Sequence, residues 1–515
     1  MKIQLKVYWK LIIINSNSYL NQSLQIEFGQ LPLAFIPING KRLYELQIQF
    51  LNKKYKNHKI FITIPENFEP GEADTKKLRE KDISIVKADS LLKALEYLKK
   101  KFALKEGLII HQGDRLVIDG PKKLNEVAIA EIDNDYNYNF EYIERSDDKN
   151  KIYAGIFAFK NYRLLIQSLV KENESFHKAL LRYAILEGIH HDISKKWFDL
   201  GNIKNYFYTK SVFTTERSFN VLKIKNYIVS KSGNDKRKII NEASWYEKVP
   251  SFLKIYVPQY YYKNNKSSSY SIEYLNNQSL SDLFVFGRHS IGFWKLILDK
   301  LNNYLLSASS FKAENKPTTI ENLSLEKTKL RLFQIKKQLK IDLDTEYFIN
   351  NNKIDSINNM FADCSERILK QKPLYGFLHG DLCLSNILFD SRSSNIKLID
   401  PRAEDSNKKF TNYGDINYDI AKLGHSFIGY YDFILAGQYN LERKKNKIEF
   451  EIFNNFERDE INNYILQYKF FNGKSFIDFL PIIITLFLSM IPLHNDSKKK
   501  QYALLANSMR LYKCL

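Results

Sequence analysis

The chain has few cysteines and no long uninterrupted hydrophobic run. Its three cysteines, Cys364, Cys383 and Cys514, show neither metal-ligand nor disulfide spacing, which fits a reducing cytosol. The most apolar segment, residues 476–492, is broken by an aspartate and a proline, so we expect a buried helix rather than a transmembrane segment. The apolar stretch at residues 11–14 is too short for a signal peptide. The sequence therefore predicts a cytoplasmic protein.

Acidic residues are fewer than basic ones, but no basic cluster accompanies the excess. The 515 residues include 78 Lys and Arg against 58 Asp and Glu, a formal net charge of +20. Short runs such as residues 99–101 and 498–500 are far apart and mixed with asparagine and acidic residues. Binding to nucleic acid would need a clustered basic face, so nucleic acid is not an expected partner. The length leaves room for two to four domains, and the oligomeric state is not indicated.

Residues suited to phosphoryl transfer gather at positions 375–390 (YGFLHGDLCLSNILFD) and 396–402 (IKLIDPR). Phosphoryl transfer from a nucleotide needs a carboxylate that orients the attacking hydroxyl and accepts its proton, and oxygen ligands for Mg²⁺. Asp381 fits the first role, and Asn386 and Asp400 fit the second. His379 would brace the loop. Two unrelated turns are the alternative, but the complete spacing is more specific than HxD alone.

This pattern resembles the catalytic and metal-binding loops of the aminoglycoside phosphotransferase and choline kinase family, relatives of the protein kinases. The resemblance implies a bilobal α+β protein-kinase-like fold that uses ATP and Mg²⁺. Asp381 would be the catalytic base, and Asn386 and Asp400 would be the Mg²⁺ ligands. Pro401 and Arg402 follow Asp400 in place of the FG of protein kinases, which argues against a protein substrate.

A kinase of this kind needs a strand lysine that reaches the nucleotide phosphates and is held by a helix glutamate. Residues 221–232 alternate as two strands and a turn, and Lys231 lies at the end of the second strand. Glu242 follows eleven residues later on a helical pattern. We therefore predict an ion pair between Lys231 and Glu242. Other lysines could take the role of Lys231: Lys223, Lys225 and Lys236.

The same resemblance assigns three further segments. Residues 214–220 (TTERSFN) would cover the nucleotide, although they contain no glycine. Residues 271–283 would form the hinge between the lobes, where backbone groups near Glu273 and Leu275 would hold the adenine. In residues 414–423 (GDINYDIAKL), the two aspartates are expected to anchor a helix and to brace the catalytic loop.

The N-terminal third has a different pattern. Apolar strand candidates alternate with helical stretches, which predicts an α/β, Rossmann-like domain with a mostly parallel sheet. The strand candidates are residues 11–14, 59–64, 83–86 and 107–111, and the helical stretches are residues 43–51 and 90–100.

Three segments in this third resemble, in order, the sugar-phosphate nucleotidyltransferases: residues 31–43 (LPLAFIPINGKRL), 107–114 (GLIIHQGD) and 153–159 (YAGIFAF). Asp114 stands at the position that would hold Mg²⁺. Residues 15–19 (NSNSY), however, lack the glycines and the arginine of a triphosphate cradle, and Leu33 replaces a common lysine. We expect a nucleotidyltransferase-like domain with lost or weakened activity that can still keep a sugar-phosphate or nucleotide pocket. An active enzyme with a variant loop is the alternative.

These assignments divide the chain into four parts: a nucleotidyltransferase-like domain (1–165), a helical connector (166–202), a kinase-like N-lobe (203–285) and a helical C-lobe with the catalytic loop (286–515). The expected activity is ATP- and Mg²⁺-dependent phosphoryl transfer to a hydroxyl of a small molecule, either a sugar or an amino alcohol such as choline. The pairing with a nucleotidyltransferase-like fold suggests surface or capsular polysaccharide biosynthesis. Three alternatives stay open: a bifunctional kinase and nucleotidyltransferase that makes a nucleotide-activated precursor, a non-catalytic nucleotide-binding scaffold, and an aminoglycoside-modifying enzyme with an acidic acceptor cleft.

Overall fold

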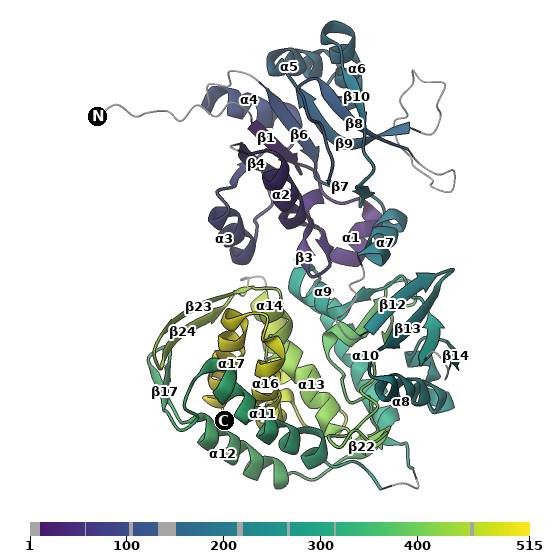
Figure 1. The fold of residues 1–515 in the computed structure, drawn as a ribbon, viewed down its shortest axis with the longest axis vertical. Helices are drawn as coiled ribbons and strands as arrows, with labels where there is room; N and C mark the ends of the chain where they lie inside the picture. The colour runs from purple at the N-terminus through teal and green to yellow at the C-terminus, as the bar shows by residue number, and fades with distance from the viewer. Residues whose placement is uncertain are drawn as a thin grey trace. The chain divides into compact units, whose positions relative to one another are not determined.

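The chain folds into two compact units, which are described separately (Figure 1). The computed structural model describes residues 11–56, 58–101, 107–131, 151–213, 220–264, 268–313, 316–453 and 458–515. The first unit comprises residues 1–214 with 286–288, and the second comprises residues 215–285 with 289–515. Helix α7 (Ile203–Val212), assigned above to the kinase-like N-lobe, therefore belongs to the first unit.

A seven-stranded sheet forms the centre of the first unit. Its strands are β1 (Leu11–Asn15), β4 (Lys59–Ile64), β5 (Ser84–Lys87), β6 (Leu108–Gln112), β8 (Glu126–Glu131), β9 (Lys151–Phe159) and β10 (His190–Ile193), in the spatial order β10-β8-β9-β6-β1-β4-β5. Only β9 runs antiparallel to its neighbours, β6 and β8. The expected α/β domain with a mostly parallel sheet is confirmed. Two short pairs accompany the sheet: β2 (Pro37–Ile38) with β3 (Lys41–Arg42), and β7 (Arg115–Val117) with β11 (Trp197–Asp199).

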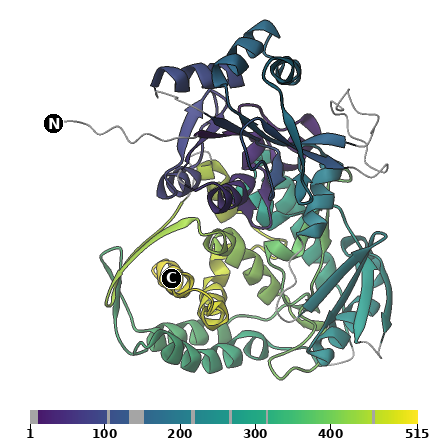
Figure 2. The ribbon, with the colours of Figure 1, turned by 45° about the horizontal axis from the view of Figure 1, so that its top comes forward.

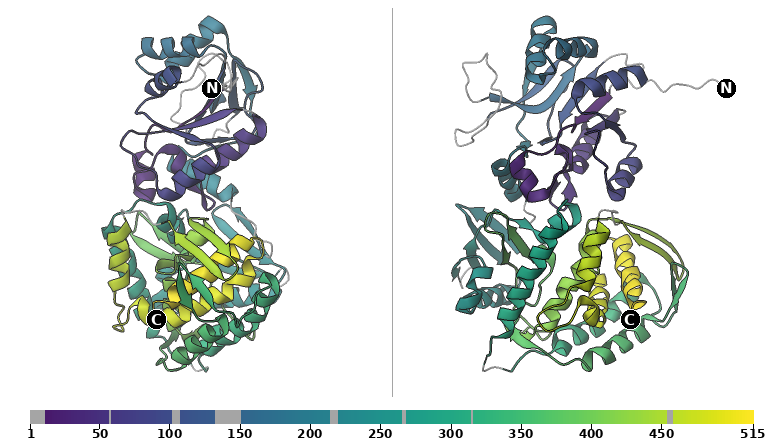
Figure 3. Two further views of the ribbon diagram at one scale, coloured as in Figure 1. Left: turned by 90° about the vertical axis from the view of Figure 1, so that its left-hand side faces the viewer. Right: turned by 180° about the vertical axis from the view of Figure 1, so that it is seen from behind.

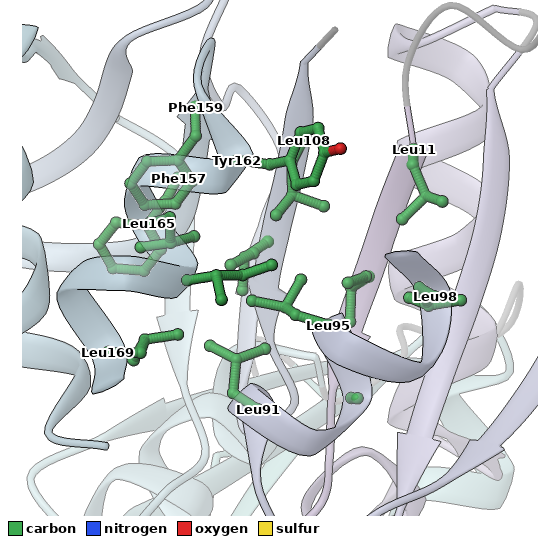
Figure 4. Close-up of a cluster of buried hydrophobic side chains, with 14 of the residues drawn as sticks. Leu11, Leu91, Leu95, Leu98, Leu108, Phe157, Phe159, Tyr162, Leu165 and Leu169 are labelled. Atoms are coloured by element: carbon green, nitrogen blue, oxygen red, sulfur yellow. The ribbon is translucent and has the colours of Figure 1, made fainter. Parts of the chain in front are cut away.

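Helices pack on this sheet through regularly spaced leucines. The helices before α7 are α1 (Gln22–Phe28), α2 (Leu43–Lys54), α3 (Glu72–Glu80), α4 (Leu91–Lys101), α5 (Tyr162–Lys171) and α6 (Phe176–Glu187). Leu91, Leu95 and Leu98 recur every three or four residues, so they share one face of α4. This face packs with Leu108 of β6 and Leu165 of α5 in one buried cluster (Figure 4). β1 is apolar and buried from Leu11 to Ile14, as expected for a strand that lies inside the sheet and is covered on both faces.

The second unit begins with a four-stranded antiparallel sheet and one helix (Figure 2). Its strands are β12 (Asn220–Lys225), β13 (Ile228–Gly233), β14 (Tyr260–Asn264) and β15 (Ser269–Glu273), in the order β12-β13-β15-β14, and the helix is α8 (Lys236–Glu247). The predicted pair of strands and turn at residues 221–232 is confirmed. Asn226 and Tyr227 both have a positive φ, as a two-residue turn of type I′ requires.

The rest of the second unit is mainly helical. Its helices are α9 (Leu280–Phe286), α10 (Ile291–Ser309), α11 (Glu326–Leu339), α12 (Ile357–Leu369), α13 (Asn417–Phe427), α14 (Tyr431–Leu435), α15 (Asp459–Gln467), α16 (Leu480–Met490) and α17 (Lys498–Tyr512). A four-stranded sheet curves around the outside of α16 and α17 (Figures 1 and 3). Its strands are β17 (Tyr347–Ile349), β18 (Asn352–Ile354), β23 (Tyr439–Lys444) and β24 (Lys447–Ile452).

One helical segment of the described chain, Phe476–His494, is long and apolar enough to span a membrane by composition. Its most apolar stretch is 78% buried inside the structure. In α16 every residue from Leu480 to Ser489 is buried. The expected buried helix is confirmed.

Candidate active site

Two short strands hold the ends of the loop that carries His379, Asp381 and Asn386. The loop leaves β19 (Tyr375–Phe377), which pairs with β22 (Tyr413–Asp415), and enters β20 (Ile387–Asp390). β20 lies between β16 (Gln278–Ser279) and β21 (Asn395–Leu398). Both strands are anchored by buried apolar side chains, so the polar residues between them have little freedom.

The side chain of Asp419, which comes from α13, holds the start of this loop by hydrogen bonds. Its two carboxylate oxygens accept the backbone N–H groups of His379 and Gly380, each at 2.8 Å. The His379 ring is fully buried, with Nδ1 accepting the N–H of Asp381 at 3.3 Å and Nε2 lying 3.1 Å from the carbonyl oxygen of Ile399. Burial lowers the pKa of His379 to about 4. The imidazole is therefore neutral near pH 7 and serves to position the loop.

Asp381 is held in an ionised state with part of its carboxylate facing solvent. Its side chain is 41% exposed, and Oδ1 lies 2.7 Å from Nζ of Lys422, which comes from α13. Asn386 donates its amide N–H to Oδ2 of Asp381 at 3.2 Å and to the backbone oxygen of Asp381 at 2.9 Å. Burial acts to raise the pKa of Asp381, but the Lys422 ammonium outweighs it and holds that pKa well below its usual range.

Backbone hydrogen bonds join the catalytic loop to the segment that carries Asp400. The N–H of Ile399 donates to the Asn386 carbonyl, and the N–H of Arg402 donates to the His379 carbonyl, each at 2.9 Å. Asp400 itself has a φ of 54°, in the left-handed region that few residues other than glycine adopt. Such strain persists where the surrounding contacts fix it, and it is common at functional sites.

Lys231 connects the four-stranded sheet to Asp400. Its Nζ lies 2.7 Å from Oε2 of Glu242 and 3.1 Å from Oδ1 of Asp400. Tyr270 donates its hydroxyl to the same oxygen of Glu242 at 3.0 Å. Burial lowers the pKa of Lys231, but the two carboxylates outweigh it and raise that pKa overall. The structure thus brings the predicted lysine and glutamate together. In the described chain, none of the three alternative lysines pairs with Glu242.

The hinge segment leaves backbone groups available. Glu273 ends β15, and its N–H and carboxylate bond the backbone of Gln259. Within the described residues, neither the N–H nor the C=O of Leu275 makes a hydrogen bond, so both suit an adenine ring. Of the predicted nucleotide-covering loop, residues 214–219 lie outside the described part of the chain.

Asn386 and Asp400 provide side-chain oxygen atoms of the kind that Mg²⁺ prefers as ligands. The Asp400 side chain is 39% exposed, so its carboxylate can be reached from solvent. The described residues contain no cluster of three or more His, Cys, Asp or Glu that could hold a metal. Mg²⁺ bound by one carboxylate, one amide and the phosphates of a nucleotide needs no such cluster. The donor set therefore fits a nucleotide-bound Mg²⁺.

In the first unit, Asp114 lies beside a second carboxylate, Asp199, which no sequence motif marks. The register of β7 with β11 places Asp199 opposite Arg115. The Arg115 guanidinium pairs with Asp199 and lies 3.8 Å from Oδ1 of Asp114. A Cβ at Gly201 would lie 2.4 Å from Oδ2 of Asp114 and 3.2 Å from Oδ1 of Asp199, so the two carboxylates converge. Asp199 lies within the segment predicted as a connector, and in the structure it is the last residue of β11.

The Asp199 carboxylate is already fully engaged. Besides Arg115, it accepts the N–H of Gly201 at 2.7 Å and the side-chain amide of Asn205 at 2.6 Å. Burial raises the pKa of Asp114, whereas Arg115 lowers it. A cation that used both carboxylates would have to compete with the guanidinium.

Neither the family models nor the curated proteins contain a match to this chain. Solved structures similar to parts of it include a choline kinase from Streptococcus pneumoniae (14% identity, 59% of this chain and 91% of that one, TM-score 0.36). They also include a CTP:phosphocholine cytidylyltransferase from the same organism (13% identity, 40% and 98%, TM-score 0.29) and a nucleoside-diphosphate-sugar pyrophosphorylase from Vibrio cholerae RC9 (9% identity, 39% and 99%, TM-score 0.31). Both kinds of enzyme resembled by the sequence are among them. At these identities and TM-scores, the similarity carries no argument about the function of this chain.

Proposed function

We propose that the second unit is an ATP- and Mg²⁺-dependent phosphotransferase that acts on a hydroxyl of a small molecule. The main support for this proposal is the ionisation and partial exposure of the Asp381 carboxylate. An ionised, partly exposed carboxylate stands on a loop that is fixed from three sides, by Asp419, Lys422 and Asn386. Such a carboxylate can accept a hydrogen bond from an incoming hydroxyl and orient its oxygen toward a phosphoryl group.

The contacts of Lys231 support the nucleotide side of the site. A lysine that is held by Glu242 and also reaches Asp400 places one positive charge beside the carboxylate that would bind Mg²⁺. This charge suits the phosphates of ATP, while Leu275 offers free backbone groups for adenine. Mg²⁺, held by Asn386 and Asp400, would neutralise charge on those phosphates.

The reaction then follows from the groups present. The acceptor hydroxyl donates its hydrogen bond to Asp381, its oxygen forms the new bond to the γ-phosphorus of ATP, and the bond from that phosphorus to the β,γ-bridging oxygen breaks. The hydroxyl proton passes to Asp381 and then to solvent. Because the transition state is loose, a weakly basic carboxylate is sufficient if it is well placed.

The first unit is proposed to be a nucleotidyltransferase-like domain without strong catalytic activity. The observation behind this is the Arg115 guanidinium, which contacts both Asp114 and Asp199. The proposed setting is cytoplasmic and the proposed pathway is surface or capsular polysaccharide biosynthesis, with a sugar or an amino alcohol as acceptor. A bifunctional enzyme would require that metal and nucleotide displace the guanidinium.

Phosphorus NMR of the purified protein with Mg²⁺, ATP and CTP, and a panel of sugars and amino alcohols, tests the proposal. We expect ADP and a new phosphate ester in the ATP reactions. Asp381→Asn should abolish the ester while Mg²⁺-dependent nucleotide binding persists. Turnover by Asp381→Asn at the wild-type rate would refute the mechanism. Pyrophosphate release from CTP would instead establish the bifunctional alternative, and no chemistry with either nucleotide would favour the scaffold.

A further inference from the structure

Lys422 pairs with Asp381, and Lys327 of α11 lies near enough to Asp381, Lys422, Arg402 and Arg331 for the charge of each to act on it. Lys327 and Arg331 stand four residues apart on α11, so they share one helix face. Lys422 comes from α13, and Arg402 follows the Asp400 loop. α11 and α13 both lie in the helical part of the second unit (Figure 1).

Hydrogen bonds fix the direction of the two arginines. Arg402 donates Nη1 to the carbonyl oxygen of Leu323, which lies just before α11, at 2.9 Å and to the hydroxyl of Tyr418 at 3.2 Å. Tyr418 stands one turn before Lys422 on α13. Arg331 donates Nη1 to the carbonyl oxygen of Ser489 in α16 at 2.8 Å. The arginines are therefore held in place by neutral groups.

Carboxylates do not balance this charge. In the described chain, Lys422 pairs with Asp381, whereas Lys327, Arg331 and Arg402 form no ion pair. The side chain of Lys327 also makes no hydrogen bond to any described residue. Burial, followed by the charges of Arg402, Arg331 and Lys422, lowers the pKa of Lys327 well below its usual range. Bringing such cations together without a counter-ion is unfavourable, so the cluster has a reason other than stability.

The nearby acids have other partners. Asp419 is turned toward the backbone of His379 and Gly380, and Asp432 accepts a hydrogen bond from the hydroxyl of Ser281 at 2.7 Å. Asp381 is engaged by Lys422 and is needed for the acceptor hydroxyl. Among the described residues, none of these three acids pairs with Lys327, Arg331 or Arg402.

A nucleotide does not account for the cluster. The phosphates of ATP are expected between Lys231 and the Mg²⁺ ligands, and Lys231 reaches Glu242 and Asp400 rather than Asp381. Lys327 and Arg331 come from a different element, and the carboxylate charge that raises the pKa of Lys327 is that of Asp381. A molecule that places a hydroxyl on Asp381 from this side would put its remaining groups among these cations.

We propose that Lys327, Arg331 and Arg402 bind an anionic group, a phosphate or a carboxylate, on the acceptor whose hydroxyl is oriented by Asp381. This inference rests on the proposed phosphotransferase activity and narrows its substrate to a phosphorylated or acidic sugar or polyol. A cationic acceptor such as choline or an aminoglycoside would be repelled by the same side chains. Charge-assisted hydrogen bonds from fixed guanidinium groups suit both phosphate and carboxylate.

Kinetics with four acceptor probes test the proposal: glucose, glucose 6-phosphate, glucuronate and choline. We expect turnover to favour the anionic probes, and comparison of phosphate with carboxylate shows which group is preferred. Lys327→Gln/Arg331→Gln should raise the KM of the anionic probe roughly tenfold or more and leave the KM of ATP unchanged. Lys329→Gln/Lys336→Gln is the matched control, because it removes the same charge from exposed positions of the same helix. An equal effect in the control, a raised KM for ATP instead, or a preference for glucose or choline would overturn the proposal while the phosphotransferase activity stands.

A binding measurement keeps the test independent of turnover. Inorganic phosphate is titrated into the full chain saturated with Mg²⁺ and ADP, at constant ionic strength, and the Tm is recorded. Phosphate should raise the Tm of the wild type and of the control, but not of Lys327→Gln/Arg331→Gln. No rise in the wild type would overturn the inference even if a phosphate ester is formed from some neutral acceptor.

The stability of a third variant separates binding from a structural role. If Lys327 serves to bind an anion, Lys327→Met should raise the Tm in the absence of phosphate. The substitution removes a cation that is repelled by Arg402, Arg331 and Lys422. A structural role predicts a lower Tm instead, and that result would count against the proposal.

Discussion

The carboxylate of Asp419 accepts the backbone N–H of His379 at 2.8 Å, and a side chain forty residues downstream thereby fixes the start of the catalytic loop. The same carboxylate accepts the N–H of Gly380, whose φ of 76° makes the sharp turn before Asp381. Both donors are buried with their acceptor, so no water replaces the bond if the acceptor is lost.

We predict that Asp419→Asn lowers kcat strongly while it preserves the fold. The asparagine side chain has one oxygen, so one of the two backbone donors would face an N–H₂ group. Leaving a buried donor unsatisfied costs roughly 1–3 kcal/mol, and a displaced Asp381 would lower kcat by roughly a hundredfold. Steady-state kinetics and thermal unfolding measure both effects. Asp363→Asn, on the partly exposed face of α12, is the control, and an equal loss of kcat there would contradict the interpretation.

The pairing of Lys422 with Asp381 predicts a pH dependence. With Lys422 present, the pKa of Asp381 stays well below its usual range, so its ionisation should not limit kcat between roughly pH 5 and 8. In Lys422→Met, burial is no longer opposed by that ammonium, so the pKa of Asp381 rises and activity should fall on the acid side. Burial raises the pKa of Asp419 to about 7 and Lys422 opposes that rise, so loss of Lys422 should shift the pKa of both carboxylates upward. A pH–rate profile with no new acid limb would refute this account, and Lys422→Arg, which keeps the charge, is the control.

The same pair gives a stability prediction with a definite sign. The folded pKa of Asp381 lies below the unfolded value of about 4, so the folded chain binds fewer protons in that range. Its ionisation therefore stabilises the fold above pH 4, and this contribution is lost as the pH falls. The difference in Tm between wild type and Lys422→Met should shrink as the pH is lowered below about 4.

The catalytic loop could be predicted from sequence because its chemistry is local. His379, Asp381 and Asn386 lie within eight residues, and the apolar runs on either side mark the strands that hold them. The pairing of Lys231 with Glu242 could also be predicted, because Lys231 lies on a strand and Glu242 lies on the helix that directly follows it. In each case a short segment contains both the residues and the reason for their contact.

The residues that were missed depend on contacts between distant segments. Asp199 lies close to Asp114 because β11 pairs with β7. No local sequence pattern predicts the pairing of these two distant strands. Lys422 and Lys327 are two lysines in a chain with many, so their type carried little information. For Lys422 there was one usable signal: it lies three residues after Asp419, on the same helix face.

The ion pair between Lys231 and Glu242 should matter for stability and for activity in separable ways. Lys231→Met leaves the buried Glu242 with only the more distant Lys238, 3.9 Å away, and loss of a buried partner typically costs roughly 3–5 kcal/mol. Glu242→Leu on the same background should recover much of the Tm but none of the activity, because the lysine that reaches Asp400 is still absent. Thermal unfolding measures the effect on stability, and kcat/KM for ATP measures the effect on activity. Recovery of activity in the double variant would show that Lys231 acts only through the fold.

The Arg115 guanidinium predicts how the first unit responds to metal. Its positive charge already pairs with Asp199 and lies 3.8 Å from Oδ1 of Asp114, so Mg²⁺ without nucleotide should not change the Tm of this unit in the wild type. Arg115→Gln removes that charge and leaves two buried acids close together, which should lower the Tm markedly. Added Mg²⁺ should then restore part of the loss, because a divalent cation can replace the guanidinium between carboxylates. Arg163→Gln, at a position with an exposed side chain, is the control. If Mg²⁺ stabilises the wild type as much as Arg115→Gln, the guanidinium does not block the site, and an active nucleotidyltransferase becomes the better account of the first unit.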